Sequence, residues 1–189
     1  MRYESLTRVL ALDLHPRHFG YVVLESPDRL LDWGVRSYRR KGNAADVLIR
    51  RRLRLLLELW RPSILILRDG LSMAQRPHQR RDGLLKQIAA EAKNQQVLVR
   101  ILTKKPGADQ GKRLTKHENA RQAAEQFSVL RWKMPPKRRA WESEDYRMSM
   151  FTAATLAMAQ LNIMIPSPLA LPECSPPSFP QNAASPKAQ

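Results

Sequence analysis

The stretch Arg8–Glu25, RVLALDLHPRHFGYVVLE, contains two apolar runs, Val9–Leu14 and Phe19–Leu24, on either side of a short polar turn with a proline. Runs of this length predict two β-strands, and the short connection predicts that they pair antiparallel. One carboxylate, Asp13, lies near the end of the first run. The residues alone leave two roles open for it, a turn aspartate that caps the polar loop or a member of a functional site.

The rest of the chain supplies three more strands and four helices. Strands are predicted over 30–38, 63–67 and 97–102, and helices over 44–60, 81–95, 116–127 and 143–161. The first three strands follow one another closely, as in an antiparallel meander, whereas the later strands alternate with helices, as parallel strands do. The order βββαβαβαα predicts an α/β fold with a mixed five-stranded sheet and helices on both faces. It is also the order of the ribonuclease H-like fold.

Charge and composition indicate the class of partner. The 189 residues carry a formal net charge of +16, which favours a polyanion, either nucleic acid or an anionic membrane surface. No apolar run approaches the roughly 20 residues of a membrane span, and the N-terminus lacks the apolar core of a signal peptide. The single cysteine, Cys174, fits a reducing compartment. We therefore expect a cytoplasmic protein that binds nucleic acid and no membrane.

The C-terminal end differs in composition from the rest. Residues 166–189 hold seven of the fourteen prolines and two charged residues. This composition is typical of disordered segments, because it offers too little apolar surface to bury. We expect one domain over residues 1–165 and a disordered tail over 166–189.

Three stretches resemble the RuvC-like family of Holliday-junction resolvases. ALDLHPRHFGYVVLE (11–25) resembles the family's opening, in which an aspartate ends the first strand and a glycine starts the second. TKHENA (115–120) is similar to its lysine-bearing helix start, and MPPKRRAWESEDYRMSMFTAATLAMA (134–159) resembles the C-terminal block of a bacterial subgroup. The resemblance covers roughly residues 8–161. It implies the ribonuclease H-like fold, a homodimer, and cleavage of branched or structured DNA that depends on magnesium or manganese.

The resemblance also implies a site. Asp13, Asp69 and Asp145 would bind the metal, Glu144 would add a further carboxylate, and Lys116 would contact the scissile phosphate. Two-metal hydrolysis of a phosphodiester needs several carboxylates that converge from different elements. The alternatives are structural: Asp69 precedes a glycine as in a turn, and Glu144 and Asp145 could simply favour the start of a helix.

Three positions, in two segments, depart from the family pattern. Arg68-Asp69 stands where the family has a glutamate and the subgroup reads Glu-Asp, and Thr152 and Thr155 stand where aspartates are expected. A hydroxyl brings no charge to a metal, and a guanidinium that points into the site repels one. Two functions therefore stay open, a structure-selective DNA endonuclease with a reduced site and a catalytically inactive DNA- or RNA-binding protein on the same fold.

Basic residues gather in two places outside the helix row Arg50–Arg54, which we interpret as a solvated face. One set lies in a loop and the helix that follows it: Lys104, Lys105, Lys112, Arg113 and Lys116. The other lies between and beside Trp132 and Trp141: Arg131, Lys133, Lys137, Arg138 and Arg139. Cations interleaved with aromatic rings suit nucleic acid, although a tryptophan is more often a core residue.

Overall fold

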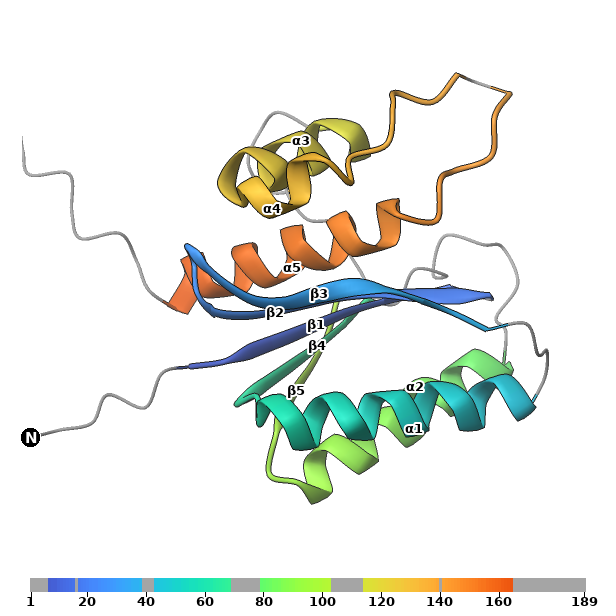
Figure 1. The fold of residues 1–189 in the computed structure, drawn as a ribbon. Coiled ribbons are helices and arrows are strands. Elements are labelled where there is room, and N and C mark those ends of the chain that lie inside the picture. The colour runs from blue at the N-terminus through green and yellow to red at the C-terminus, as the bar shows by residue number, and fades with distance from the viewer. Residues whose placement is uncertain are drawn as a thin grey trace, which may run out of the picture.

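A computed structural model describes residues 7–15, 17–38, 43–68, 79–102, 114–139 and 141–164. These residues form one five-stranded sheet and five helices (Figure 1). The strands are β1 (Val9–Leu14), β2 (His18–Ser26), β3 (Arg29–Ser37), β4 (Ile64–Arg68) and β5 (Leu98–Leu102). The helices are α1 (Asn43–Trp60), α2 (Gln79–Asn94), α3 (Lys116–Gln126), α4 (Ser128–Arg131) and α5 (Met148–Met164).

The sheet has the order β3-β2-β1-β4-β5. β1 pairs antiparallel with β2 and parallel with β4, while β2–β3 is antiparallel and β4–β5 is parallel. The predicted mixed α/β sheet is therefore confirmed, and β1 is its central strand. All six residues of β1 are buried, because helices cover both faces of the sheet.

The two faces follow from the alternation of side chains along each strand. Val9 and Ala11 of β1 pack into the cluster that contains α3, α4 and α5, whereas Leu10 and Leu12 pack into the cluster that contains α1 and α2. Figure 1 shows the same division, with α5 between the sheet and the α3–α4 pair on one side and α1 and α2 on the other. Asp13 continues the series of Val9 and Ala11 and so belongs to the α5 face.

Most predicted boundaries are shifted by one or two residues, and three of the differences bear on the site. The last helix begins at Met148 rather than at residue 143, because the Asp145 carboxylate accepts a hydrogen bond from the Arg147 backbone N–H and closes a local turn. β4 includes Arg68, which pairs with Asp13 on one side and Leu102 on the other. Phe127 adopts an extended conformation after α3, and the single turn of α4 follows it.

Gly20 allows α5 to approach the sheet very closely. A Cβ at this position would lie 2.2 Å from the Ser149 carbonyl carbon and 2.3 Å from the Met150 nitrogen, both backbone atoms of the first turn of α5. Gly20 is also the cross-strand partner of Asp13. The missing side chain therefore brings the start of α5 onto the sheet beside the end of β1.

Within the ranges given above, no helix is both long enough and apolar enough to cross a membrane. The predicted boundary at residue 165 and the proline-rich tail lie outside the described residues. They stay predictions.

We expect Gly20→Ala to lower the free energy of unfolding by about 1–3 kcal/mol or more, because the new methyl group must displace backbone atoms of α5. Gly83→Ala is the matched control, since a Cβ at Gly83 in α2 meets nothing within 4 Å and alanine favours a helix. Urea denaturation of both variants measures the difference. Equal stability of the two variants would show that α5 does not rest on Gly20.

Candidate functional site

One row of cross-strand neighbours forms the centre of the site. Asp13 of β1 pairs with Gly20 of β2 on one side and with Arg68 of β4 on the other. Arg68 continues the series of Ile64 and Ile66, which face α5, so both charged side chains belong to the same face of the sheet. The row lies at the end of β1 and β4 where these parallel strands finish.

Two cationic or potentially cationic groups face the Asp13 carboxylate, which is only 2% exposed. His15 Nε2 lies 3.0 Å from Asp13 Oδ2, and Arg68 Nη1 lies 3.9 Å from the same oxygen. The Arg68 side chain is itself 11% exposed. A buried carboxylate needs partners of this kind to offset its desolvation. The Arg68 side chain therefore points into the site. The sequence alone did not decide this direction.

A pair of histidines extends the site beyond the end of β1. The rings of His15 and His18 are stacked with their centroids 4.6 Å apart, and the His18 ring meets Tyr146 edge-on at 6.3 Å. Burial lowers the pKa of His18, and the neighbouring His15 lowers it further, while Asp13 and Glu144 act in the opposite direction. The folded protein therefore favours a neutral His18 imidazole.

The other described carboxylates of the predicted site are each paired with a cation. Glu144 accepts hydrogen bonds of 2.7 and 2.8 Å from Lys116 Nζ. Asp145 accepts from Arg147 Nη2 at 2.7 Å, and these hydrogen bonds hold the pKa of Asp145 below its usual range. The sequence had suggested that both residues lie in the first turn of the last helix. They lie instead in the segment before α5. Asp69 lies outside the described residues.

The described residues do not fit a two-metal centre. Among them, no three histidine, cysteine or acidic side chains are grouped closely enough to hold a metal ion. Thr152 and Thr155, at the positions where the family has aspartates, donate their hydroxyls to the Met148 and Phe151 carbonyls of α5 at 2.9 Å. Arg68 adds positive charge where a divalent cation would have to approach Asp13. The assignment of Asp13, Asp69 and Asp145 to a metal stays a prediction.

The basic surface of the site comes from the start of α3 and from residues 131–139, which we call the 131–139 segment. Lys137, Arg138 and Arg139 are exposed, as is Arg131, and Lys133 is half-buried. Lys116, Lys137 and Arg138 line a cavity of about 570 Å³ between the start of α3 and this segment. The predicted loop residues Lys104, Lys105, Lys112 and Arg113 lie outside the described residues.

Thr115 fixes the place of Lys116, and the sequence analysis did not use it. The Thr115 hydroxyl accepts from the Glu118 N–H, and the Glu118 carboxylate accepts from the Thr115 N–H, which makes a capping box. The signal was present in the sequence, since a threonine followed three residues later by a glutamate is typical of a helix start. The box makes Lys116 the first residue of α3, where it reaches Glu144.

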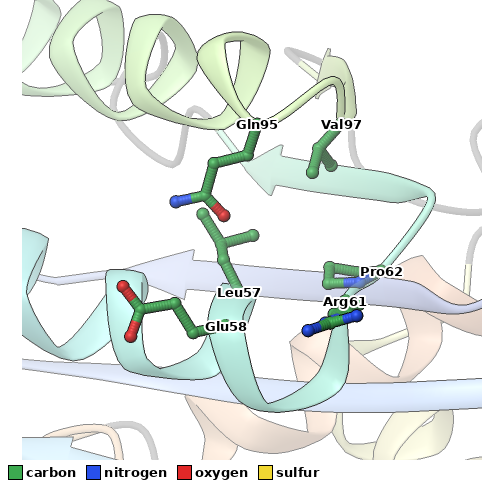
Figure 2. A pocket seen from close by; sticks show the side chains of 6 residues that line it. All are labelled: Leu57, Glu58, Arg61, Pro62, Gln95 and Val97. Carbon is green, nitrogen blue, oxygen red and sulfur yellow. The ribbon is translucent and has the colours of Figure 1, made fainter.

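A second cavity of about 360 Å³ lies at the opposite end of the sheet, where the turns that precede β4 and β5 meet the end of α1 (Figure 2). Leu57 and Val97, which belong to the core, form part of its wall, and Glu58, Arg61, Pro62 and Gln95 complete the lining. Arg61 precedes β4 and Arg68 ends it, so this cavity is separate from the Asp13 row.

Comparison with known proteins identifies the fold. No protein-family model matches the sequence, and no curated protein matches it. Thermus thermophilus RuvC has a TM-score of 0.62 and 17% identity over 85% of this chain and 97% of that chain. RuvC of the same organism in complex with a Holliday junction substrate has a TM-score of 0.52 and 15% identity, over 84% of this chain and 96% of that one. The yeast mitochondrial Holliday junction resolvase has a TM-score of 0.55 and 13% identity, over 82% and 78%. The chain therefore has the RuvC-like resolvase fold.

The depressed pKa of His18 predicts a dependence of stability on pH. Below the unfolded-state pKa of about 6.5 the unfolded chain binds a proton at His18 more readily than the folded protein does. The free energy of unfolding is therefore unaffected by His18 well above pH 6.5, and it decreases as the pH falls below that value. We expect His18→Gln to weaken the loss of stability between pH 7.5 and 5.5, measured by urea denaturation. An identical loss in wild type and variant would contradict the assignment.

Proposed function

We propose that this chain is a nucleic-acid-binding protein that holds branched DNA on the α5 side of its RuvC-like fold, and that its cleavage activity has been lost. The observation that carries the proposed loss of cleavage is the direction of the Arg68 side chain, whose guanidinium lies 3.9 Å from Asp13 Oδ2. A cation beside the buried Asp13 carboxylate opposes the approach of a divalent metal. The pairing of Glu144 with Lys116 and of Asp145 with Arg147 supports the same conclusion.

Charge and fold support the proposed binding to branched DNA. The formal net charge of +16 is compatible with a polyanionic partner, and the exposed cations of the 131–139 segment are available for phosphate contacts. A solved RuvC with the same fold is in complex with a Holliday junction substrate. That likeness suggests a four-way DNA junction as the first ligand to try with this chain.

A second candidate is a magnesium- or manganese-dependent endonuclease that acts as a homodimer. The observation in its favour is the position of Asp13, which ends β1 beside β4 at the edge where the family implies a catalytic aspartate. Asp69 follows Arg68 directly in the chain. The two candidates differ in whether Asp13 binds metal, which can be measured.

Reversal of charge in the 131–139 segment tests the binding surface. Each phosphate contact contributes about 0.9 to the slope of log Kobs against log salt concentration. We therefore expect Lys137→Glu/Arg138→Glu to weaken binding to a four-way junction and to lower that slope by about 2. Arg51→Glu/Arg52→Glu is the matched control, because both arginines are exposed on α1 across the sheet. Binding should be measured in EDTA; equal losses in both variants would count against a localised surface.

Calorimetric titration of magnesium and manganese, with and without junction DNA, tests the loss of the metal site. We expect no heat that depends on Asp13 in the wild type and no cleavage of the junction. Arg68→Glu/Thr152→Asp restores the acidic pattern of the family, and we expect it to bind metal in a way that Asp13→Asn abolishes. Thermal melts first establish that each variant is folded. Metal binding and nicking by the wild type, both abolished by Asp13→Asn, would establish the endonuclease instead.

A further inference from the structure

Two tryptophans are strongly exposed to solvent. Trp132 is 68% exposed and Trp141 is 78% exposed, whereas Trp33 and Trp60 are half-buried. An indole ring is the largest apolar side chain, and its usual place is a core or an interface. The proposed binding to branched DNA through cations leaves these two rings without a role.

Local contacts position the Trp132 ring and the backbone that carries Trp141. Trp132 follows α4 directly and meets the ring of Trp33 from β3 edge-on, with the centroids 6.2 Å apart. Trp141 lies inside a turn that is closed at both ends: the Arg139 N–H donates to Glu142 Oε2 at 3.0 Å, and the Glu142 N–H donates to the Arg139 carbonyl at 3.2 Å. A residue whose ring or backbone is already positioned loses less conformational entropy when a planar partner stacks on it.

Each ring has a cation beside it. Lys133 Nζ lies 3.8 Å from the centre of the Trp132 ring, and the Arg139 guanidinium carbon lies 5.7 Å from that of Trp141. Lys137 and Arg138 are exposed along the chain between the rings. An alternation of cations and rings corresponds to the alternation of phosphates and bases along a single strand.

We propose that Trp132 and Trp141 are stacking platforms for unpaired bases, so that the preferred substrate is a branched DNA with single-stranded nucleotides next to the branch. This inference rests on the proposed function and specifies its substrate. A fully paired duplex covers both faces of each base, so it gives the rings nothing to stack on. Aromatic rings and cations also occur on membrane-binding surfaces, but those rings share one face of an amphipathic helix. Here they lie at the two ends of an irregular segment with two prolines.

The test compares two ligands in EDTA: a four-way junction with all arms paired, and the same junction with one arm replaced by unpaired thymidine strands. We expect tighter binding to the second ligand and quenching of tryptophan fluorescence by it. Stacking of one base on an aromatic ring corresponds to roughly a 5- to 150-fold change in affinity. Trp132→Leu and Trp141→Leu should each remove a share of the preference within that range. Trp132→Phe and Trp141→Phe should keep more of it, because a phenyl ring still stacks.

Leu59→Ala is the matched control, since Leu59 of α1 is also 68% exposed and lies across the sheet from Trp132. It should leave both affinities unchanged. Equal binding of the paired and unpaired ligands, with no effect of either leucine variant, would overturn the inference while the proposed function stands. Failure to bind either ligand would overturn both. Quenching by vesicles of phosphatidylglycerol and phosphatidylcholine, without a response to thymidine strands, would replace the inference with a membrane surface.

Discussion

The contact between the backbone of α5 and Gly20 is the constraint on which the site depends. With Ser149 and Met150 of α5 seated where a Cβ would lie, the helix starts directly above the pair Gly20–Asp13. The residues just before the helix are carried to the same edge, and Tyr146 meets the ring of His18 there. A larger residue at position 20 would lift the helix and separate the segment before α5 from the end of β1. One absent side chain thus decides which chemical groups meet.

Arg68 shows how one residue can stabilise the fold and at the same time oppose metal binding at Asp13. A buried carboxylate without a partner would cost several kcal/mol, so the partners His15 and Arg68 contribute to stability. The same guanidinium reduces the attraction of Asp13 for a divalent cation, because like charges at short range repel each other. A glutamate at position 68 would attract a metal but would also set a second negative charge beside Asp13 with no cation between them. Stability without metal and affinity for metal therefore favour opposite charges at this position.

The sequence predicted the fold well because its main signals are local. Alternating or continuous apolar runs marked the strands, and the helix predicted over 116–127 agrees with α3 to within a residue at each end. The start of α5 was wrong because the Asp145–Arg147 interaction competes with the helix, and composition does not reveal which of the two wins. The approach of Arg68 to Asp13 was unpredictable from either strand alone, since the register of β4 on β1 is set by packing across the whole sheet. The proximity of His15 and His18, in contrast, follows from the antiparallel pairing of β1 and β2, which brings the residues at the ends of these strands together.

The exposed cations on the two sides of the sheet differ in their neighbours. α1 also displays arginines, but Arg54 is bound to Glu91, and leucines rather than aromatic rings accompany the others. On the α5 side, cations stand next to exposed rings and next to the cavity at the start of α3. These groups belong to α3 and the 131–139 segment, whereas the Asp13 row belongs to the sheet and depends on strand register. Because separate elements carry the two surfaces, a change at position 68 alters the chemistry at Asp13 without moving the exposed cations of the 131–139 segment. This division is what the proposed function requires, because metal-dependent cleavage could then be lost at Asp13 while the basic surface stays unchanged.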